Sequence, residues 1–107
     1  MTVIDPSRPG VTLINVFRVA PENCDELLAV LHAATEDVMR HVPGFVSANF
    51  HRALDGSRVT NYAQWESRGA FEAMLADPAA RDHMGRCAAL AESFDANLYE
   101  VAVCVGA

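Results

Sequence analysis

The order in which strand-like and helix-like segments follow one another is the feature that most restricts how this chain can fold. Residues 11–19 (VTLINVFRV) are β-branched and apolar, which predicts a strand. Residues 22–42 carry apolar side chains at helical spacing and predict a long amphipathic helix, which ends at the Pro-Gly pair of residues 43–44. Two more strands are expected over residues 45–54 and 58–66, joined as an antiparallel hairpin by the turn sequence Asp-Gly-Ser.

The second half of the chain continues the alternation. A short helix is expected over residues 67–76, and a further helix begins after Asp77, has Pro78 at its first position and runs to about Ser93. Residues 97–105 (NLYEVAVCV) predict the last strand. This order predicts an α+β fold of the ferredoxin-like type, a βαββαβ sandwich in which a four-stranded antiparallel sheet carries its helices on one face.

A chain of 107 residues is long enough for one domain and too short for two. We expect residues 11–107 to form that domain. Residues 1–10 contain two prolines and a glycine without periodicity, and are expected to form a flexible arm or an arm that docks on a partner.

The sheet face away from the helices is expected to be apolar, and its predicted residues are Ile14, Val16, Phe50 and Tyr62. A bare apolar face of this size would be exposed to water in a monomer. We therefore expect a homodimer that buries the open sheet face against a second copy.

Composition narrows the class of partner. The net charge is −6 and the chain has no lysine, which argues against nucleic acid and against an anionic membrane surface. No apolar run approaches the roughly 20 residues of a membrane span. The three cysteines are far apart and form no CxxC pair, which is typical of free thiols in a reducing cytoplasm, where we expect the protein to be located.

Strand alternation predicts a group of polar residues beneath the helices. On the first strand Asn15 shares a face with Phe17, and on the third strand Asn61 shares a face with Trp65. If strict alternation also holds on the second strand, Asn49 and His51 join them. Buried amides are costly unless they are hydrogen-bonded, so the group either ties the strands together or binds a ligand. His51 could instead be a half-exposed strand histidine. No metal-binding motif is present, so no metal site is expected.

A longer stretch resembles a known family. The segment PGFVSANFHRALDGSRVTNYAQWES, followed by AFEAML and DPAARDH, closely resembles the antibiotic biosynthesis monooxygenase (ABM) family, and the likeness extends over residues 11–105. The resemblance implies a dimer whose two sheets form a common α+β barrel. Within the family it is nearest to small anthrone oxygenases of aromatic polyketide pathways. These convert an anthrone to a quinone with O₂ as co-substrate and without flavin, haem or metal.

The resemblance also implies roles for individual residues. Asn15 and Asn61 match amides that stabilise a developing oxyanion, Trp65 matches an aromatic pocket residue, and His51 matches a strand histidine that could take the substrate proton. Phe71 stands where some members have a tyrosine, which puts a tyrosine-based proton relay in doubt. An arginine of the second long helix recurs in the family, and Arg86 is the candidate here, with Arg81 as the alternative. The residues expected to bind the small aromatic substrate are Phe17, Asn49, Phe71, Met74 and Arg86.

The sequence also allows two other functions. Haem-degrading monooxygenases of the same superfamily share the strand asparagine matched by Asn15, and His83 lies near their iron-binding histidine. However, Met74 stands about where they have a tryptophan. A non-catalytic small-molecule-binding module is favoured by Phe71 in place of tyrosine. The joint presence of Asn15, Asn61 and Trp65 argues against it.

Overall fold

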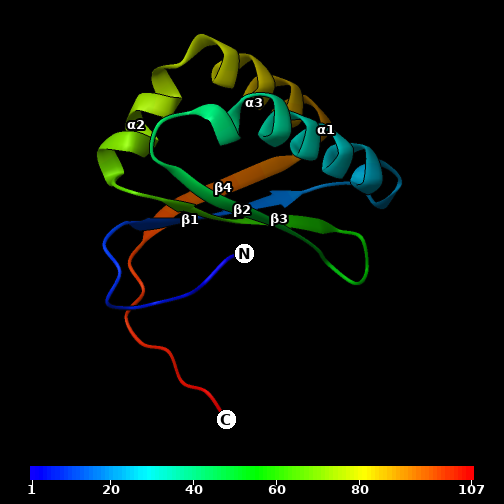
Figure 1. Ribbon diagram of the computed structural model, residues 1–107. Helices are drawn as coiled ribbons and strands as arrows, with labels where there is room; N and C mark the ends of the chain where they lie inside the picture. Colours follow the sequence, from blue (N-terminus) through cyan, green and yellow to red (C-terminus); the bar gives the residue numbers. More distant parts are fainter.

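The computed structural model describes all 107 residues and confirms the predicted α+β class (Figure 1). Strands and helices follow in the expected order, and a short 3₁₀ turn stands on each side of the first helix. The elements are β1 (Val11–Arg18), α1 (Cys24–Asp37), β2 (Phe45–Arg52), β3 (Arg58–Trp65), α2 (Arg68–Ala76), α3 (Pro78–Leu90) and β4 (Ser93–Tyr99), and the 3₁₀ turns are Pro21–Asn23 and Met39–His41.

The four strands form one antiparallel sheet in the order β2-β3-β1-β4. The three helices cover one face of the sheet, and both chain termini lie on the opposite side (Figure 1). This is the expected ferredoxin-like arrangement. None of the helices is long and apolar enough to cross a membrane.

Strand β2 contains an irregularity that changes which of its residues face the helices. Its pairing with β3 shifts between Phe45 and Ser47, so that one extra residue, Val46, is inserted at the start of the strand. Beyond this bulge, Phe50 pairs with Asn61 and therefore faces the helices. The prediction that Phe50 lies on the open face was wrong, because it assumed unbroken alternation along the strand.

The same bulge moves two predicted site residues to the other side of the sheet. Asn49 pairs with Tyr62, and His51 pairs with Thr60, and both of these β3 residues belong to the open face. The prediction that Asn49 and His51 lie under the helices was therefore wrong. A bulge reverses the phase of every residue after it, and nothing in the local sequence marks its position.

The first helix is shorter than expected. Helix α1 ends at Asp37, Val38 leaves the helical region, and residues 39–41 tighten into the 3₁₀ turn. Val42 adopts an extended conformation, as residues before proline do. Gly44 then turns the chain into β2 with a φ of +87°, a conformation that favours glycine.

The last strand lies earlier in the chain than expected. Helix α3 ends at Leu90, and β4 runs from Ser93 to Tyr99 instead of over residues 97–105. The reason is that β4 pairs only with β1, whose last paired residue at that end is Thr12, opposite Tyr99. The chain beyond Tyr99 has no neighbouring strand to bond with.

The predicted start of α3 is confirmed in detail. The Asp77 carboxylate accepts hydrogen bonds from the backbone N–H groups of Ala79, at 2.9 Å, and Ala80, at 3.1 Å. Pro78 occupies the first position of the helix, where no intrahelical N–H bond is lost. Ser67 caps α2 in the same way, accepting from the Ala70 N–H at 3.0 Å.

Candidate active site

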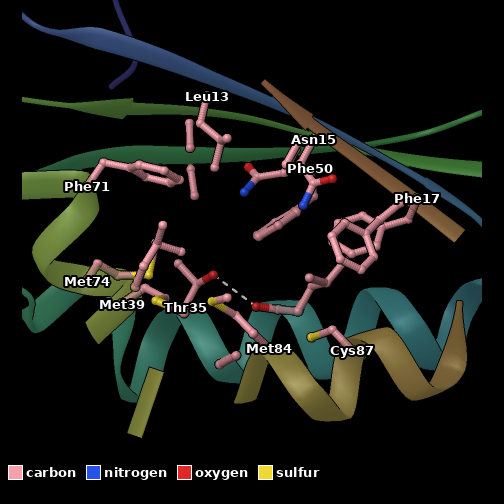
Figure 2. Close-up of a pocket in the computed structure, with 18 of the residues that line it drawn as sticks. Leu13, Asn15, Phe17, Thr35, Met39, Phe50, Phe71, Met74, Met84 and Cys87 are labelled. Atoms are coloured by element: carbon pink, nitrogen blue, oxygen red, sulfur yellow. Dashed lines mark hydrogen bonds between the residues drawn. The ribbon is translucent and has the colours of Figure 1, made fainter. Parts of the chain in front are cut away.

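A cavity of about 340 Å³ lies between the sheet and the three helices (Figure 2). It is lined by 21 residues, of which 18 are hydrophobic. Figure 2 shows Leu13, Asn15 and Phe17 of β1 on one wall, with Met39, Met84 and Cys87 on the helix wall opposite. The cavity therefore has a sheet wall and a helix wall, and the space between two such walls suits a flat ligand.

Aromatic side chains stand at both ends of the cavity. At one end, Trp65 makes edge-to-face contacts with Phe45, at a centroid distance of 5.5 Å, and with Phe71, at 6.0 Å. At the other end, the rings of Phe17 and Phe94 are 6.2 Å apart. Trp65 is only 3% exposed, whereas Phe94 is 57% exposed. Trp65 therefore lies in an enclosed part of the cavity, whereas Phe94 lies where β4 is exposed to solvent.

Small residues fill the middle of the sheet wall. Ala48 of β2 pairs with Ala63 of β3, and Ala96 of β4 pairs with Asn15 of β1. All four line the cavity. Because alanine projects little beyond the backbone, the centre of the wall leaves room for a ring system between the aromatic ends.

Two asparagines lie side by side in this wall. Asn15 and Asn61 are direct partners in the β1–β3 ladder. Their Oδ1 atoms are buried and have no hydrogen-bond partner, and the same is true of the indole Nε1 of Trp65. An unpaired buried polar atom costs about 1–3 kcal/mol, so three of them mark a place that a ligand can complete.

The cavity carries no charged side chain. Among its lining residues the only ionisable group is the Cys87 thiol. Burial raises the pKa of Cys87 above its usual value, which keeps the thiol neutral. No group of three or more His, Cys, Asp or Glu side chains is placed to hold a metal ion. A ligand in this cavity meets apolar surface, amides, an indole N–H and a hydroxyl.

The structure brings together most of the site residues expected from the sequence. Those that line the cavity are Asn15, Asn61, Trp65, Phe17, Phe71 and Met74. Arg86 and Arg81, the candidates for the arginine of related proteins, do not line the cavity. Arg86 is exposed and pairs with Asp82, one turn away on the same helix, at 3.0 Å. Arg81 is also exposed. The prediction that Arg86 reaches the cavity was wrong, because its side chain lies on the solvent side of α3.

The polar groups of Asn49 are already engaged outside the cavity. Its amide donates to the Tyr62 carbonyl at 2.9 Å, and its Oδ1 accepts from the Thr2 hydroxyl at 2.7 Å. His51 is exposed on the same face, and His83 does not line the cavity either. Because no histidine lines the cavity, no imidazole is available there to bind a haem iron.

Several lining residues were missed from the sequence. Thr35 lies one turn after Leu31, so the helical period that identified Leu31 could also have identified it. Met39 lies in the 3₁₀ turn that was expected to be α-helix, and Phe94 lies in a segment that was expected to be the link between α3 and the last strand. The helical spacing put Met39 on the apolar face of the first helix, whereas Phe94 could not be placed without the true ends of α3 and β4.

Comparison with known proteins agrees with this geometry. The family model described as "Antibiotic biosynthesis monooxygenase" matches residues 10–86. The tetracenomycin-F1 monooxygenase of Streptomyces glaucescens is 53% identical over 87 residues, which cover 81% of this chain and 78% of that protein.

Two solved structures are similar over nearly the whole chain. The monooxygenase from the gene ActVA-Orf6 of Streptomyces coelicolor, solved in complex with the ligand nanaomycin D, has a TM-score of 0.85 and 30% identity, covering 96% of each chain. SnoaB from Streptomyces nogalater, described as a cofactor-independent oxygenase, has a TM-score of 0.74 and 26% identity, covering 91% of this chain and 97% of its own.

The unpaired amides lead to a prediction about stability. Replacing Asn61 by leucine, which has nearly the same shape, should raise the free energy of unfolding of the ligand-free protein by about 1–2 kcal/mol, because it removes a buried polar group that has no partner. Urea denaturation followed by circular dichroism measures this change.

Asn49 supplies the matched control on the neighbouring strand. Asn49→Leu should lower the free energy of unfolding by about 1 kcal/mol, because it leaves the hydroxyl of Thr2 and the carbonyl of Tyr62 without this partner. Equal destabilisation by both substitutions would contradict the assignment of Asn61 as an unsatisfied group.

Proposed function

Because the chain belongs to the antibiotic biosynthesis monooxygenase family, we propose that it oxidises an anthrone-type polyketide intermediate to a quinone with O₂, without flavin, haem or metal. The observation that carries this proposal is an uncharged apolar cavity that contains the side-chain amides of Asn15 and Asn61 and the unpaired indole N–H of Trp65. The relatives add support, since one is named for monooxygenase action on tetracenomycin F1 and another is described as a cofactor-independent oxygenase.

The reaction balances with O₂ as the only co-substrate. The CH₂ group of the anthrone loses two hydrogens and gains one oxygen atom, which becomes the new quinone carbonyl. The second oxygen atom leaves as water with those two hydrogens. Four electrons pass to O₂, two from each C–H bond broken, so no external reductant is needed.

The protein's task is to make the substrate an electron donor. Loss of a proton from the anthrone gives an enolate, which is electron-rich enough to reduce O₂. We assign the Nδ2–H groups of Asn15 and Asn61 to donate hydrogen bonds to the enolate oxygen, while their unpaired Oδ1 atoms are acceptors available to a substrate O–H. Trp65 places its ring against the substrate and offers one further N–H. In an apolar cavity these donors act without competition from water.

No side chain of the cavity can serve as a general base at neutral pH. His51 lies on the opposite face of the sheet, and the Cys87 thiol is held neutral. We therefore assign the proton to water near the exposed Phe94, and we assign the two amides the task of lowering the pKa of the bound substrate. His51 has no part in this mechanism.

We also propose a homodimer through the open face of the sheet. Ile14, Val16 and Tyr62 lie on that face, as their pairing with one another and with their neighbours requires. The chain after Tyr99 adds exposed apolar side chains on the same side of the molecule: Val103 is 73% exposed and Val105 is 89% exposed (Figure 1). A second copy would remove these surfaces from water. We expect the dimer to act in the cytoplasm, which agrees with its three free cysteines.

The dimer has a direct test. Light scattering should give twice the chain mass of 11.6 kDa across a tenfold dilution. Tyr62→Asp places a charge in the middle of the proposed interface and should shift the mass to that of one chain. A wild-type mass equal to one chain would reject the proposal.

The proposed activity is tested by oxygen uptake and quinone absorbance with emodin anthrone and metal-free protein in the presence of a chelator. Asn61→Ala should lower kcat/KM by about 100-fold, as removal of an oxyanion donor does, and Trp65→Phe should lower it by about tenfold. Both variants should keep the circular dichroism spectrum of the wild type.

His51→Ala is the control variant, since its side chain lies outside the cavity. It should keep kcat/KM within about twofold of the wild type, because a substitution outside the site changes free energies by only about 0.5 kcal/mol, and it should keep the mass of the wild type in light scattering. A loss with His51→Ala as large as that with Asn61→Ala would contradict the mechanism. Wild-type uptake no faster than autoxidation in buffer would reject the oxygenase and leave a binding module.

A further inference from the structure

Thr35 is the one hydroxyl in a wall that is otherwise apolar. Helix α1 contributes Leu31, Ala34 and Thr35 to the cavity, and the other helix-side residues are aliphatic, aromatic or sulfur-containing. Figure 2 shows Thr35 on the helix side, across the cavity from Leu13 and Asn15 of β1. The polar atoms of the site are therefore divided between two opposite walls, with amides on the sheet and a hydroxyl on the helix.

The proton of this hydroxyl already makes a hydrogen bond within the helix. The Thr35 Oγ1 donates to the backbone carbonyl of Leu31 at 2.9 Å, the dashed line in Figure 2. A hydroxyl has one donor and two acceptor lone pairs, so what remains available to the cavity is an acceptor. Thr35 can therefore receive a hydrogen bond from a ligand O–H but cannot give one to a ligand carbonyl.

The rest of the helix wall offers little that could orient a ligand. Met39, Met74 and Met84 are flexible thioethers that adapt to the outline of a ring system, and the Cys87 thiol is a weak hydrogen-bonding group. These side chains can fit several orientations of a flat molecule. Thr35 is the one residue of this wall whose hydrogen bonding can favour one orientation of the ligand over the others.

We propose that Thr35 is a specificity-determining residue that accepts a hydrogen bond from a phenolic hydroxyl of the substrate. The inference rests on the proposed function and narrows its substrate class. The substrate is a polycyclic phenol with two polar edges: an oxygen at Asn15 and Asn61, and a free hydroxyl on the edge that faces α1. An analogue that lacks the second hydroxyl, or carries a methyl ether there, loses this bond.

The test uses a matched pair of substrates. Emodin anthrone and chrysophanol anthrone differ by one hydroxyl, which lies away from the ring carbonyl. The wild type should prefer emodin anthrone in kcat/KM by about fivefold or more, the range of one neutral hydrogen bond. Thr35→Val keeps the shape of the side chain without its acceptor and should bring the ratio of the two kcat/KM values to about one. Thr35→Ser keeps the acceptor and should retain the wild-type ratio.

A binding measurement separates this inference from the proposed activity. Trp65 is the single tryptophan of the chain and lies in the cavity wall, so quenching of its fluorescence reports occupancy. Dissociation constants of the quinones emodin and chrysophanol should show the same preference and the same dependence on Thr35. This preference without any turnover would overturn the proposed activity and support the inference. No preference in the wild type, or one that Thr35→Val leaves intact, would overturn the inference.

Discussion

Two asparagines whose Oδ1 atoms are buried without hydrogen-bond partners in an apolar cavity are the constraint on which the rest of this structure depends. Asn15 and Asn61 are opposite one another in the β1–β3 ladder, so the register of two central strands fixes their positions. Each unpaired group costs about 1–3 kcal/mol, a large fraction of the roughly 5–15 kcal/mol by which domains are stable. A fold that keeps such groups has them available for a ligand, at the cost of stability in its absence.

The remainder of the fold makes that cavity possible. The alanines at positions 48 and 63 leave space above the sheet, while Trp65 and Phe45 close one end. The bulge at Val46 matters most, because it lets Phe50 face the helices together with Phe45 and sends Ser47 and Asn49 to the other face. One inserted residue in β2 thus keeps polar side chains out of the uncharged cavity. It places them on the open face of the sheet, where the chain termini lie and where a second copy is expected to bind.

The fold and most of the expected site residues could be predicted from the sequence, and the physical reasons for the rest are specific. Alternation correctly placed Asn15, Asn61 and Trp65 on one face because β1 and β3 are regular. It failed for His51 because the bulge in β2 depends on tertiary packing, which no local pattern encodes. Arg86 was placed by family resemblance, which fixes a position along a helix but not the rotamer or the ion pair that holds the side chain in solvent. The spacing of Thr35 from Leu31 places it on the inner side of α1, but spacing alone does not show that its hydroxyl reaches a cavity.

A cavity without a charged group can promote ionisation of its own substrate only by lowering the pKa of that substrate, and the pH dependence of kcat/KM distinguishes this from proton removal by a protein base. For free enzyme and substrate this profile reports the essential pKa values. We expect kcat/KM to rise with pH through the pKa of the free anthrone, and we expect the midpoint to move in step when anthrones of different acidity are compared. A midpoint that stays near the usual histidine pKa of about 6.5 for every substrate would show that a protein base takes the proton, and would contradict the account.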